Sequence, residues 1–156
     1  MICYRYTTER NPPAPFVRVS VRCSLTREVI DSCNAQIDTA ADRTVLPLRI
    51  VQALNLPERG VFQFQGFGSE VLNVPYYLVE VSIHDFPPVQ IMAILGEREP
   101  YILLGRDVLN SHRLLLDGPN LAFEIERPSE PEPPLIPESG PTSPGDTPPS
   151  APPSSS

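Results

Sequence analysis

The sequence has 156 residues, of which 40% are hydrophobic, and this supports one modest domain. Its net charge is −7, and all 12 basic residues are arginine. Because the chain offers no basic patch that could neutralise phosphates, we expect no nucleic-acid partner. Without lysine, Schiff-base chemistry on a lysine is also excluded.

The two ends of the chain differ in composition from its middle. Residues 1–14 are polar and interrupted by proline, which predicts a loose N-terminal lead-in. Residues 128–156 hold 11 of the 21 prolines and four acidic residues but no basic one. So few apolar side chains cannot offset the entropy lost on ordering, which predicts a disordered Pro/Ser-rich acidic tail over 127–156. The folded domain is therefore expected to cover residues 15–126.

The cysteines and the hydropathy pattern bear on the compartment. Cys3, Cys23 and Cys33 are odd in number and lack the C-x-x-C spacing of a zinc site. Reduced thiols are expected, which indicates a cytoplasmic protein. The first twenty residues show no signal pattern, and no apolar run approaches membrane-spanning length, so we expect no membrane partner.

Short apolar segments alternate with turn residues through the middle of the chain. Phe16–Cys23 carries three valines on one face and polar residues on the other, which predicts a half-buried strand. The other strands that we expect are Val29–Ile37, Val61–Phe67, Glu70–Val74, Tyr76–Ile83, Val89–Leu95, Ile102–Leu104, Leu114–Leu116 and Leu121–Ile125. Two short helices are expected, Leu48–Leu54 with Leu48, Val51 and Leu54 facing the core, and Arg106–Ser111. Many short strands with regular turns predict an all-β, barrel-like domain.

One stretch, Ala35–Pro47, carries the functional signal with the letters AQIDTAADRTVLP. Asp38 follows an apolar strand, and the chain becomes apolar again at Val45. A carboxylate between apolar residues is costly to bury unless a partner shares or neutralises its charge. Asp38 is therefore either a structural residue with a local hydrogen-bond partner or a working carboxylate, and we favour the second.

This stretch resembles the D-T/S-G-A-D-x-T-V-L signature of the retropepsin family, the retroviral-type aspartic proteases and their cellular and bacterial relatives. A second segment, Ile102–Ile125 (ILLGRDVLNSHRLLLDGPNLAFEI), resembles the second signature of that family. The resemblance covers roughly Phe16 to Ile125 and implies a retropepsin-like acid protease barrel that supplies half an active site per chain. The sequence departs from the pattern at Ala40, where the family has glycine.

Peptide hydrolysis by carboxylates needs two of them close together, one to accept a proton from water and one to donate a proton to the carbonyl oxygen. At about 3 Å and an effective dielectric of about 20, two ionised carboxylates repel by roughly 5 kcal/mol, so the pair shares one proton. The chain has one Asp-Thr-Ala element. Asp31 lacks the small-residue turn that follows Asp38, and Asp107 begins a predicted helix, where the dipole favours an acid. The second carboxylate is therefore expected from a second copy in a homodimer.

The resemblance also implies roles for individual residues. In the catalytic group, Thr39 would hydrogen-bond across the two-fold axis beside Asp38, and Ala40 would offer its backbone carbonyl to the substrate. The hairpin tip would close over the peptide as a flap, and Leu121–Ile125 would join an inter-subunit sheet. The expected substrate-binding residues are Ala41, Asp42, Val45, Gly66, Phe67 and Gly68. The expected structural supports are Gly105 and the ion pair between Asp42 and Arg106.

Together these observations predict an aspartic endopeptidase that hydrolyses a peptide or protein substrate through a water activated by paired Asp38 residues, without a metal or organic cofactor. Ala40 leaves an alternative open. If this position needs a positive φ or close substrate approach, alanine damages the site, and the chain is then a catalytically impaired dimer that binds peptides. A third reading is a monomeric β-barrel interaction domain.

Overall fold

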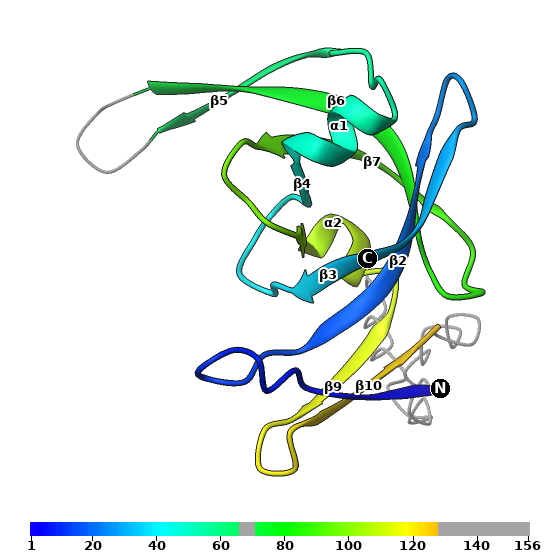
Figure 1. Ribbon diagram of the computed structural model, residues 1–156, viewed down its shortest axis with the longest axis vertical. Coiled ribbons are helices and arrows are strands. Elements are labelled where there is room, and N and C mark those ends of the chain that lie inside the picture. The colour runs from blue at the N-terminus through cyan, green and yellow to red at the C-terminus, as the bar shows by residue number, and fades with distance from the viewer. Residues whose placement is uncertain (66–70, 128–156) are drawn as a thin grey trace, which may run out of the picture.

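The computed structural model describes residues 1–65 and 71–127, and its centre is a closed six-stranded barrel (Figure 1). In spatial order the barrel strands are β2 (Phe16–Cys23), β3 (Val29–Ile37), β8 (Ile102–Leu104), β4 (Val45–Pro47), β7 (Val89–Gly96) and β6 (Val71–Ile83). Pairing of β2 with β6 closes the ring, and β5 (Gly60–Gln65) extends it along the free part of β6. With the short helices α1 (Leu48–Ala53) and α2 (Arg106–Leu109), this confirms the predicted all-β barrel.

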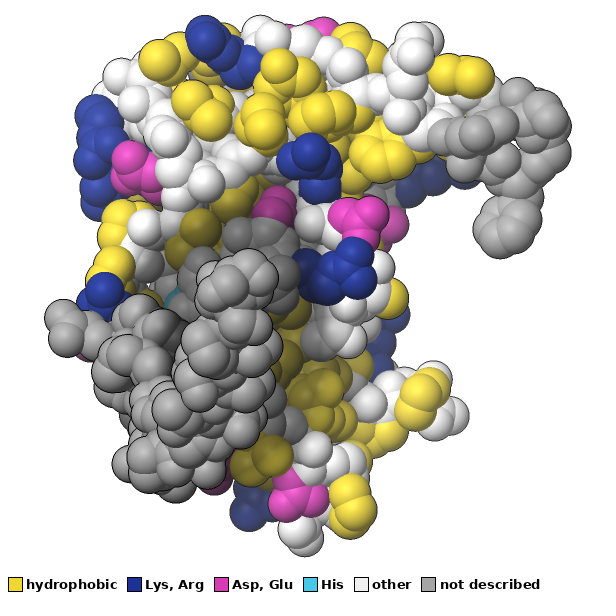
Figure 2. Space-filling view, turned by 180° about the vertical axis from the view of Figure 1, so that it is seen from behind, with side chains coloured by type: hydrophobic (Ala, Val, Ile, Leu, Met, Phe, Trp, Pro, Cys, Tyr) yellow, Lys and Arg dark blue, Asp and Glu magenta, His cyan; other side chains and the backbone are white. Residues whose placement is uncertain are grey.

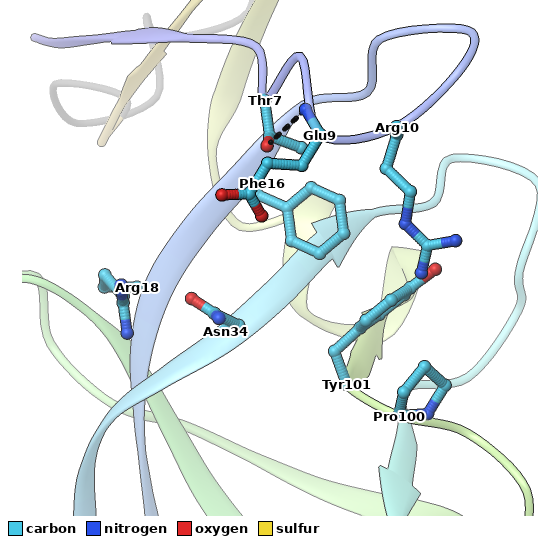
Figure 3. Close-up of a pocket in the computed structure, with 8 residues that line it drawn as sticks. All are labelled: Thr7, Glu9, Arg10, Phe16, Arg18, Asn34, Pro100 and Tyr101. Carbon is cyan, nitrogen blue, oxygen red and sulfur yellow. Dashed lines mark hydrogen bonds between the residues drawn. The ribbon is translucent and has the colours of Figure 1, made fainter.

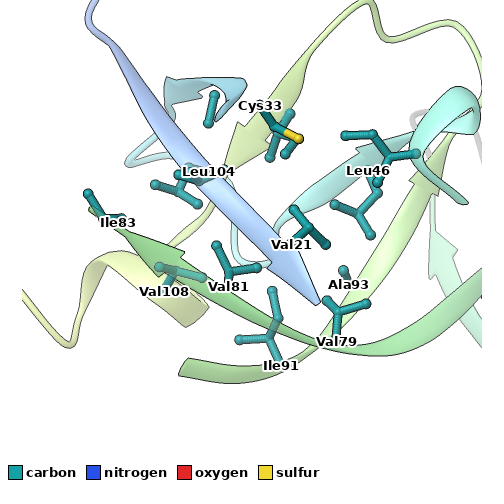
Figure 4. Close-up of a cluster of buried hydrophobic side chains, with 14 of the residues drawn as sticks. Val21, Cys33, Leu46, Val79, Val81, Ile83, Ile91, Ala93, Leu104 and Val108 are labelled. Carbon is teal, nitrogen blue, oxygen red and sulfur yellow. The ribbon is translucent and has the colours of Figure 1, made fainter. Parts of the chain in front are cut away.

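The barrel encloses one apolar core, in which branched side chains from every wall meet (Figure 4). The alternation in β2 is realised as predicted, since Val17, Val19 and Val21 are at most 2% exposed. β2 and β3 pair antiparallel over the bounds that the sequence predicts, with Val17 opposite Ala35. Because the inner faces of β2 and β3 are buried, their polar residues lie on the outer surface.

The hairpin of β5 and β6 is longer than the sequence predicts. Two strands were expected on either side of Pro75, and the structure has the single 13-residue strand β6. β7 pairs with β6 only from Tyr76 onward, so the N–H that proline lacks falls where β6 has a single neighbour. The hairpin therefore continues without a break from the barrel wall outward, and hydrophobic side chains gather over the end of the molecule from which it extends (Figure 2).

Helix α1 turns a different face to the core than the sequence predicts. Ile50, Val51 and Leu54 are buried, whereas Leu48 is 38% exposed. The chain enters the helix directly from β4, a short strand that was not predicted and that ends at Pro47. Pairing of β4 with β7 and β8 sets the direction of entry, so the first helical residue points away from the core.

The N-terminal segment is not the loose lead-in that the composition suggested. Ile2–Arg5 forms strand β1, which pairs antiparallel with β10 (Ala122–Glu126). Ile2 and Tyr4 pack against the core, and the Tyr4 ring stacks on Phe123 at 4.8 Å between centroids. The apolar residues at alternate positions of β1 thus complete a small sheet under the barrel, and the proline-rich stretch follows as a connecting arm to β2.

The last strand lies inside a small sheet. The predicted closing hairpin is present as β9 (Arg113–Asp117) and β10, and β10 lies in the middle of the three-stranded sheet. Both edges of β10 are therefore occupied within its own chain, so an inter-subunit sheet that includes Leu121–Ile125 would be extended from β1 or β9. The outer strands of this sheet are β1 and β9.

Two sequence predictions fall on residues outside the described ones. The predicted flap tip, Gly66, Phe67 and Gly68, lies within residues 66–70, and the predicted tail over 127–156 lies outside the described residues except for Arg127. Over residues 1–65 and 71–127, no helix is long and apolar enough to cross a membrane.

Candidate active site

The loop from Asp38 to Arg43 leaves the barrel where β3 ends. The backbone N–H of Asp38 donates to the carbonyl oxygen of Leu104 at 3.0 Å, which extends the parallel pairing of β3 with β8 by one residue. The side chain of Asp38 is half-buried, whereas Thr39 and Ala40 are exposed. The barrel thus presents this carboxylate at the end of a rigid strand, next to residues that face outward.

The loop itself orients the Asp38 carboxylate. Oδ1 accepts hydrogen bonds from the backbone N–H groups of Ala40 and Ala41, each at 3.1 Å. Such a turn is typical of an aspartate that caps its own loop and fixes the side-chain rotamer. The second oxygen, Oδ2, forms no hydrogen bond within the part of the chain that the structure describes. One oxygen is therefore held by the protein and the other remains available to a water or a second carboxyl group.

Ala40 adopts an ordinary backbone conformation. It is absent from the residues with positive φ, which include Arg27, Ser32 and Asn55. An L-residue pays a steric cost only in the left-handed region, so alanine here introduces no backbone strain. A required positive φ is therefore not a reason for alanine to damage the site, and close approach of the substrate is the one that remains.

A buried polar anchor that was not predicted holds the far end of the loop. Thr44 is fully buried, its N–H donates to both oxygens of Asp107 at 3.0 and 2.9 Å, and its hydroxyl donates to Oδ1 at 2.7 Å. The same hydroxyl accepts from the N–H of Gly105 at 3.1 Å. Asp107 therefore binds the loop as well as standing in the first turn of α2. The sequence signal was a threonine at the start of the apolar run Val45–Pro47, together with an acid in the second signature.

Gly105 is required by a close approach of two backbones. A Cβ at this position would lie 2.5 Å from the carbonyl carbon of Arg43 and 2.8 Å from the nitrogen of Thr44. The next residue adds a further link, because the N–H of Arg106 donates to the carbonyl oxygen of Ala41 at 2.9 Å. The turn before α2 and the Asp38 loop are thus fitted against each other along their backbones.

Replacing Gly105 by alanine should lower the free energy of unfolding by about 1–3 kcal/mol, because the added methyl group must push these backbones apart. Urea denaturation of the full chain measures the loss. Gly118→Ala is the matched control, since a Cβ there meets no atom within 4 Å. Equal stability of the two variants would show that the contact at Gly105 does not constrain the loop.

The side chains of Asp42 and Arg106 form an ion pair between the loop and α2. Their side chains are 77% and 49% exposed, so we expect this pair to contribute no more than about 1 kcal/mol. Its role is to orient the loop, while the Thr44–Asp107 bonds inside the barrel carry more of the attachment. Val45, the remaining predicted substrate contact in this region, is half-buried at the start of β4.

The loop also contacts the base of the β5–β6 hairpin. The guanidinium carbon of Arg43 lies 4.1 Å from the centroid of the Phe62 ring, and Phe62 packs against Tyr76 at 4.5 Å. Gly60 has a φ of +156°, and a Cβ there would lie 2.8 Å from the Tyr76 ring. The hairpin therefore leaves the barrel beside the loop that carries Asp38 (Figure 1).

On the other side of the loop, Thr39 borders a cavity of about 440 Å³ that runs over α2 to β9. Its other lining residues are Arg106, Leu109, Asn110, His112, Leu114 and Leu116. Burial lowers the pKa of the His112 imidazole, which favours its neutral form. This flank of the loop is therefore largely apolar, with one charged group at its edge.

The other carboxylates considered from sequence do not approach Asp38 as free groups. Asp31 lies seven residues earlier in β3, about 23 Å along the strand, and accepts from the Ser20 hydroxyl at 2.7 Å. Asp107 is engaged by Thr44. Among the described residues, Asp38 is thus a single oriented carboxylate with one available oxygen.

No protein-family model matches this sequence, and no curated protein does. Several solved structures are similar to it. A retropepsin-like aspartic protease from Rickettsia conorii aligns with a TM-score of 0.53 at 13% identity, over 78% of this chain and 86% of that one. The EIAV protease complexed with the inhibitor HBY-793 gives 0.42 at 25% identity, over 69% and 92%. The retroviral protease-like domain of Ddi1 from Leishmania major gives 0.41 at 14%, over 67% and 81%.

Of these three, the Rickettsia structure has a TM-score above 0.5, and at 13% identity it bears on the fold alone. Its alignment covers 78% of this chain. The chain therefore has the fold of the retropepsin-like aspartic proteases.

Proposed function

We propose that the chain is an aspartic endopeptidase that works as a homodimer, with Asp38 of each copy meeting across a two-fold axis. The observation that carries this proposal is the state of Asp38: one oxygen is fixed by two backbone N–H groups, and the other has no partner in the described chain. A structural aspartate would satisfy both oxygens internally, as Asp107 does. A carboxylate with one oxygen fixed and the other unbonded is suited to bind a water and a second carboxyl group.

In the proposed reaction the two carboxyl groups share one proton, because two negative charges at close range cannot both persist. The ionised Asp38 takes a proton from the bound water, whose oxygen attacks the carbonyl carbon of the scissile peptide bond. The protonated Asp38 gives its proton to the carbonyl oxygen. The Asp38 that took the water proton then gives it to the amide nitrogen, while the other Asp38 takes a proton from a hydroxyl group of the tetrahedral intermediate. The C–N bond breaks, the carboxylic acid and the amine are released, and the pair again holds one proton. No metal or organic cofactor takes part in these steps.

Exposed apolar side chains on the small sheet support the proposed homodimer. The edge strand β9 exposes 57% of Leu115 and 44% of Leu116, and Met1 is 74% exposed at the end of β1. These apolar side chains lie on the outer strands of the small sheet, and the cavity beside Thr39 is continuous with β9 through Leu114 and Leu116. A partner seated over this surface would bury apolar area and reach Thr39 at the same time. The Asp38 loops would then face each other.

The test is cleavage of a peptide mixture by the full chain between pH 3 and 7, with the solution mass measured in parallel. We expect internal cleavage with an acidic optimum and a mass of two chains. Specific activity should fall on dilution below the dimer dissociation constant, because a single chain holds half a site. A fully active monomer would overturn the proposal. A dimer that binds peptides without cleaving them would instead identify the catalytically impaired binding module, and Ala40→Gly should then restore turnover.

A further inference from the structure

A second cavity, of about 440 Å³, lies under the arm that connects β1 to β2 (Figure 3). The arm turns back on itself, because the N–H groups of Thr7 and Ala14 donate to each other's carbonyl oxygens at 2.9 and 3.2 Å. This closure holds the intervening residues over the barrel wall. The side chains that define the cavity are Glu9, Arg10, Phe16, Arg18, Asn34 and Tyr101.

Strand register places this cavity on the same face of the barrel as Asp38. Side chains at alternate positions of a strand share a face, so Asn34 and Gln36 point to the side where Asp38 follows. Phe16 lies opposite Gln36 in β2, and Arg18 lies opposite Asn34. On the other side of β3, Leu103 of β8 lies beside Gln36, and Tyr101 precedes Leu103 by two residues. The cavity and Asp38 therefore lie on the same face of these strands.

The separation matches a short length of extended peptide. Asn34 precedes Asp38 by four residues along β3, which corresponds to about 13 Å at roughly 3.3 Å per residue. A substrate bound in extended form rises by nearly the same amount per residue. A side chain about four positions from the scissile bond would therefore reach the cavity.

The walls of the cavity combine positive charge with aromatic surface. The guanidinium carbon of Arg10 lies 4.6 Å from the centroid of the Tyr101 ring, and Phe16 meets that ring edge-on at 4.8 Å. Arg18 donates one hydrogen bond to the carbonyl oxygen of Ser32 at 2.8 Å. A guanidinium stacked on a ring or bound through one N–H keeps other donors in its plane for a ligand.

The charges of the cavity are not neutralised internally. Within residues 1–65 and 71–127, neither arginine forms an ion pair, and neither does Glu9. Two guanidinium groups against one carboxylate leave the cavity with a net positive charge. Arginine binds carboxylates through paired N–H donors, and the two rings offer apolar surface to methylene groups.

We infer that this cavity selects a glutamate or aspartate side chain of the peptide substrate, about four residues from the bond that is cut. Arg10 and Arg18 bind the carboxylate, and Phe16 and Tyr101 contact its stem. The inference rests on the proposed protease function and adds to it the class of substrate: peptides with an acidic residue at that distance.

The experiment compares the full wild-type chain with Arg10→Gln, Arg10→Glu and Arg18→Gln. Mass spectrometry of cleaved peptide mixtures gives residue frequencies around the cut, and twin peptides that differ by Glu or Gln at the enriched position give kcat/KM. We expect kcat/KM of wild type to be about fivefold higher for the Glu peptide than for the Gln peptide. Arg10→Gln and Arg18→Gln should lose this preference, and Arg10→Glu should instead enrich lysine at that position. Glu9→Gln should strengthen the preference, because it removes a competing carboxylate from the cavity.

Arg59→Gln is the matched control, since it makes the same charge change at an exposed arginine that does not line the cavity, and its preference should equal that of wild type. Cleavage without an acidic preference overturns this inference and leaves the protease intact. If no peptide is cleaved, the protease proposal fails. Binding of the labelled Glu and Gln peptides to the full chain then tests whether the cavity selects an acidic side chain. Tighter binding of the Glu peptide, lost in Arg10→Gln, supports it, and equal binding overturns it.

Discussion

Replacing Asp38 by asparagine should reduce peptide cleavage by at least about 10²–10⁴-fold, the usual contribution of a general acid or base, while the dimer persists. Asparagine keeps the oxygen that accepts the N–H groups of Ala40 and Ala41, so the loop should retain its shape. What is lost is the group that exchanges a proton with water. The measurements are kcat/KM on a cleaved peptide and the mass in solution.

Asp31→Asn is the matched control, because it changes another acid of the same strand, far from the loop. It should leave kcat/KM unchanged. Retained activity in Asp38→Asn would reject the proposed mechanism, and a monomeric Asp38→Asn variant would show that the substitution acts through assembly instead.

Mixing the two proteins tests whether each site needs both copies. If subunits exchange freely, a one-to-one mixture of wild type and Asp38→Asn should show about one half of the activity per wild-type chain, because half of the wild-type chains sit in inactive heterodimers. A ninefold excess of the variant should leave about one tenth. Activity that stays constant per wild-type chain after exchange would mean that one Asp38 is sufficient.

The parts of the fold that depend on local patterns could be predicted from sequence. β2 and β3 have the bounds that their alternation and turn residues indicate, because one face of each is buried and the register is therefore strongly specified. The closing hairpin was recognised for the same reason. The acid of the Ala35–Pro47 stretch lies where an apolar strand ends, as the sequence suggested, and the structure adds the hydrogen bonds that orient it.

Features set by contacts between distant segments could not be predicted. The Thr44–Asp107 bonds join residues 63 positions apart, and they exist only because Gly105 lets two backbones approach. Strand β1 was missed because its partner, β10, lies at the other end of the domain. A four-residue apolar alternation is too short to identify a strand without that partner, and the prolines that follow pointed toward a loose segment.

Apart from Asp38→Asn, the variant with the largest expected effect is Asp107→Ala, which should lower the free energy of unfolding by about 2–6 kcal/mol. The estimate sums the cost of leaving two buried donors of Thr44, its N–H and its hydroxyl, without an acceptor at about 1–3 kcal/mol each. Thr44 is fully buried, so its N–H and hydroxyl depend on Asp107 for an acceptor. Because this anchor holds the loop that carries Asp38, kcat/KM should fall with stability even at temperatures where the chain is folded.

Urea denaturation at one protomer concentration measures the effect, since the apparent stability of the proposed dimer depends on concentration. Asp107→Asn should lose less than Asp107→Ala, because the amide oxygen can still accept from Thr44. Asp85→Ala, at an exposed acid, is the control and should change stability by less than about 0.5 kcal/mol. The double variant Thr44→Val/Asp107→Ala should be more stable than the sum of the single losses predicts, because removing both partners leaves fewer unsatisfied groups. Additive losses would mean that the two residues stabilise the loop independently, and the anchor would then not be the link between α2 and the site.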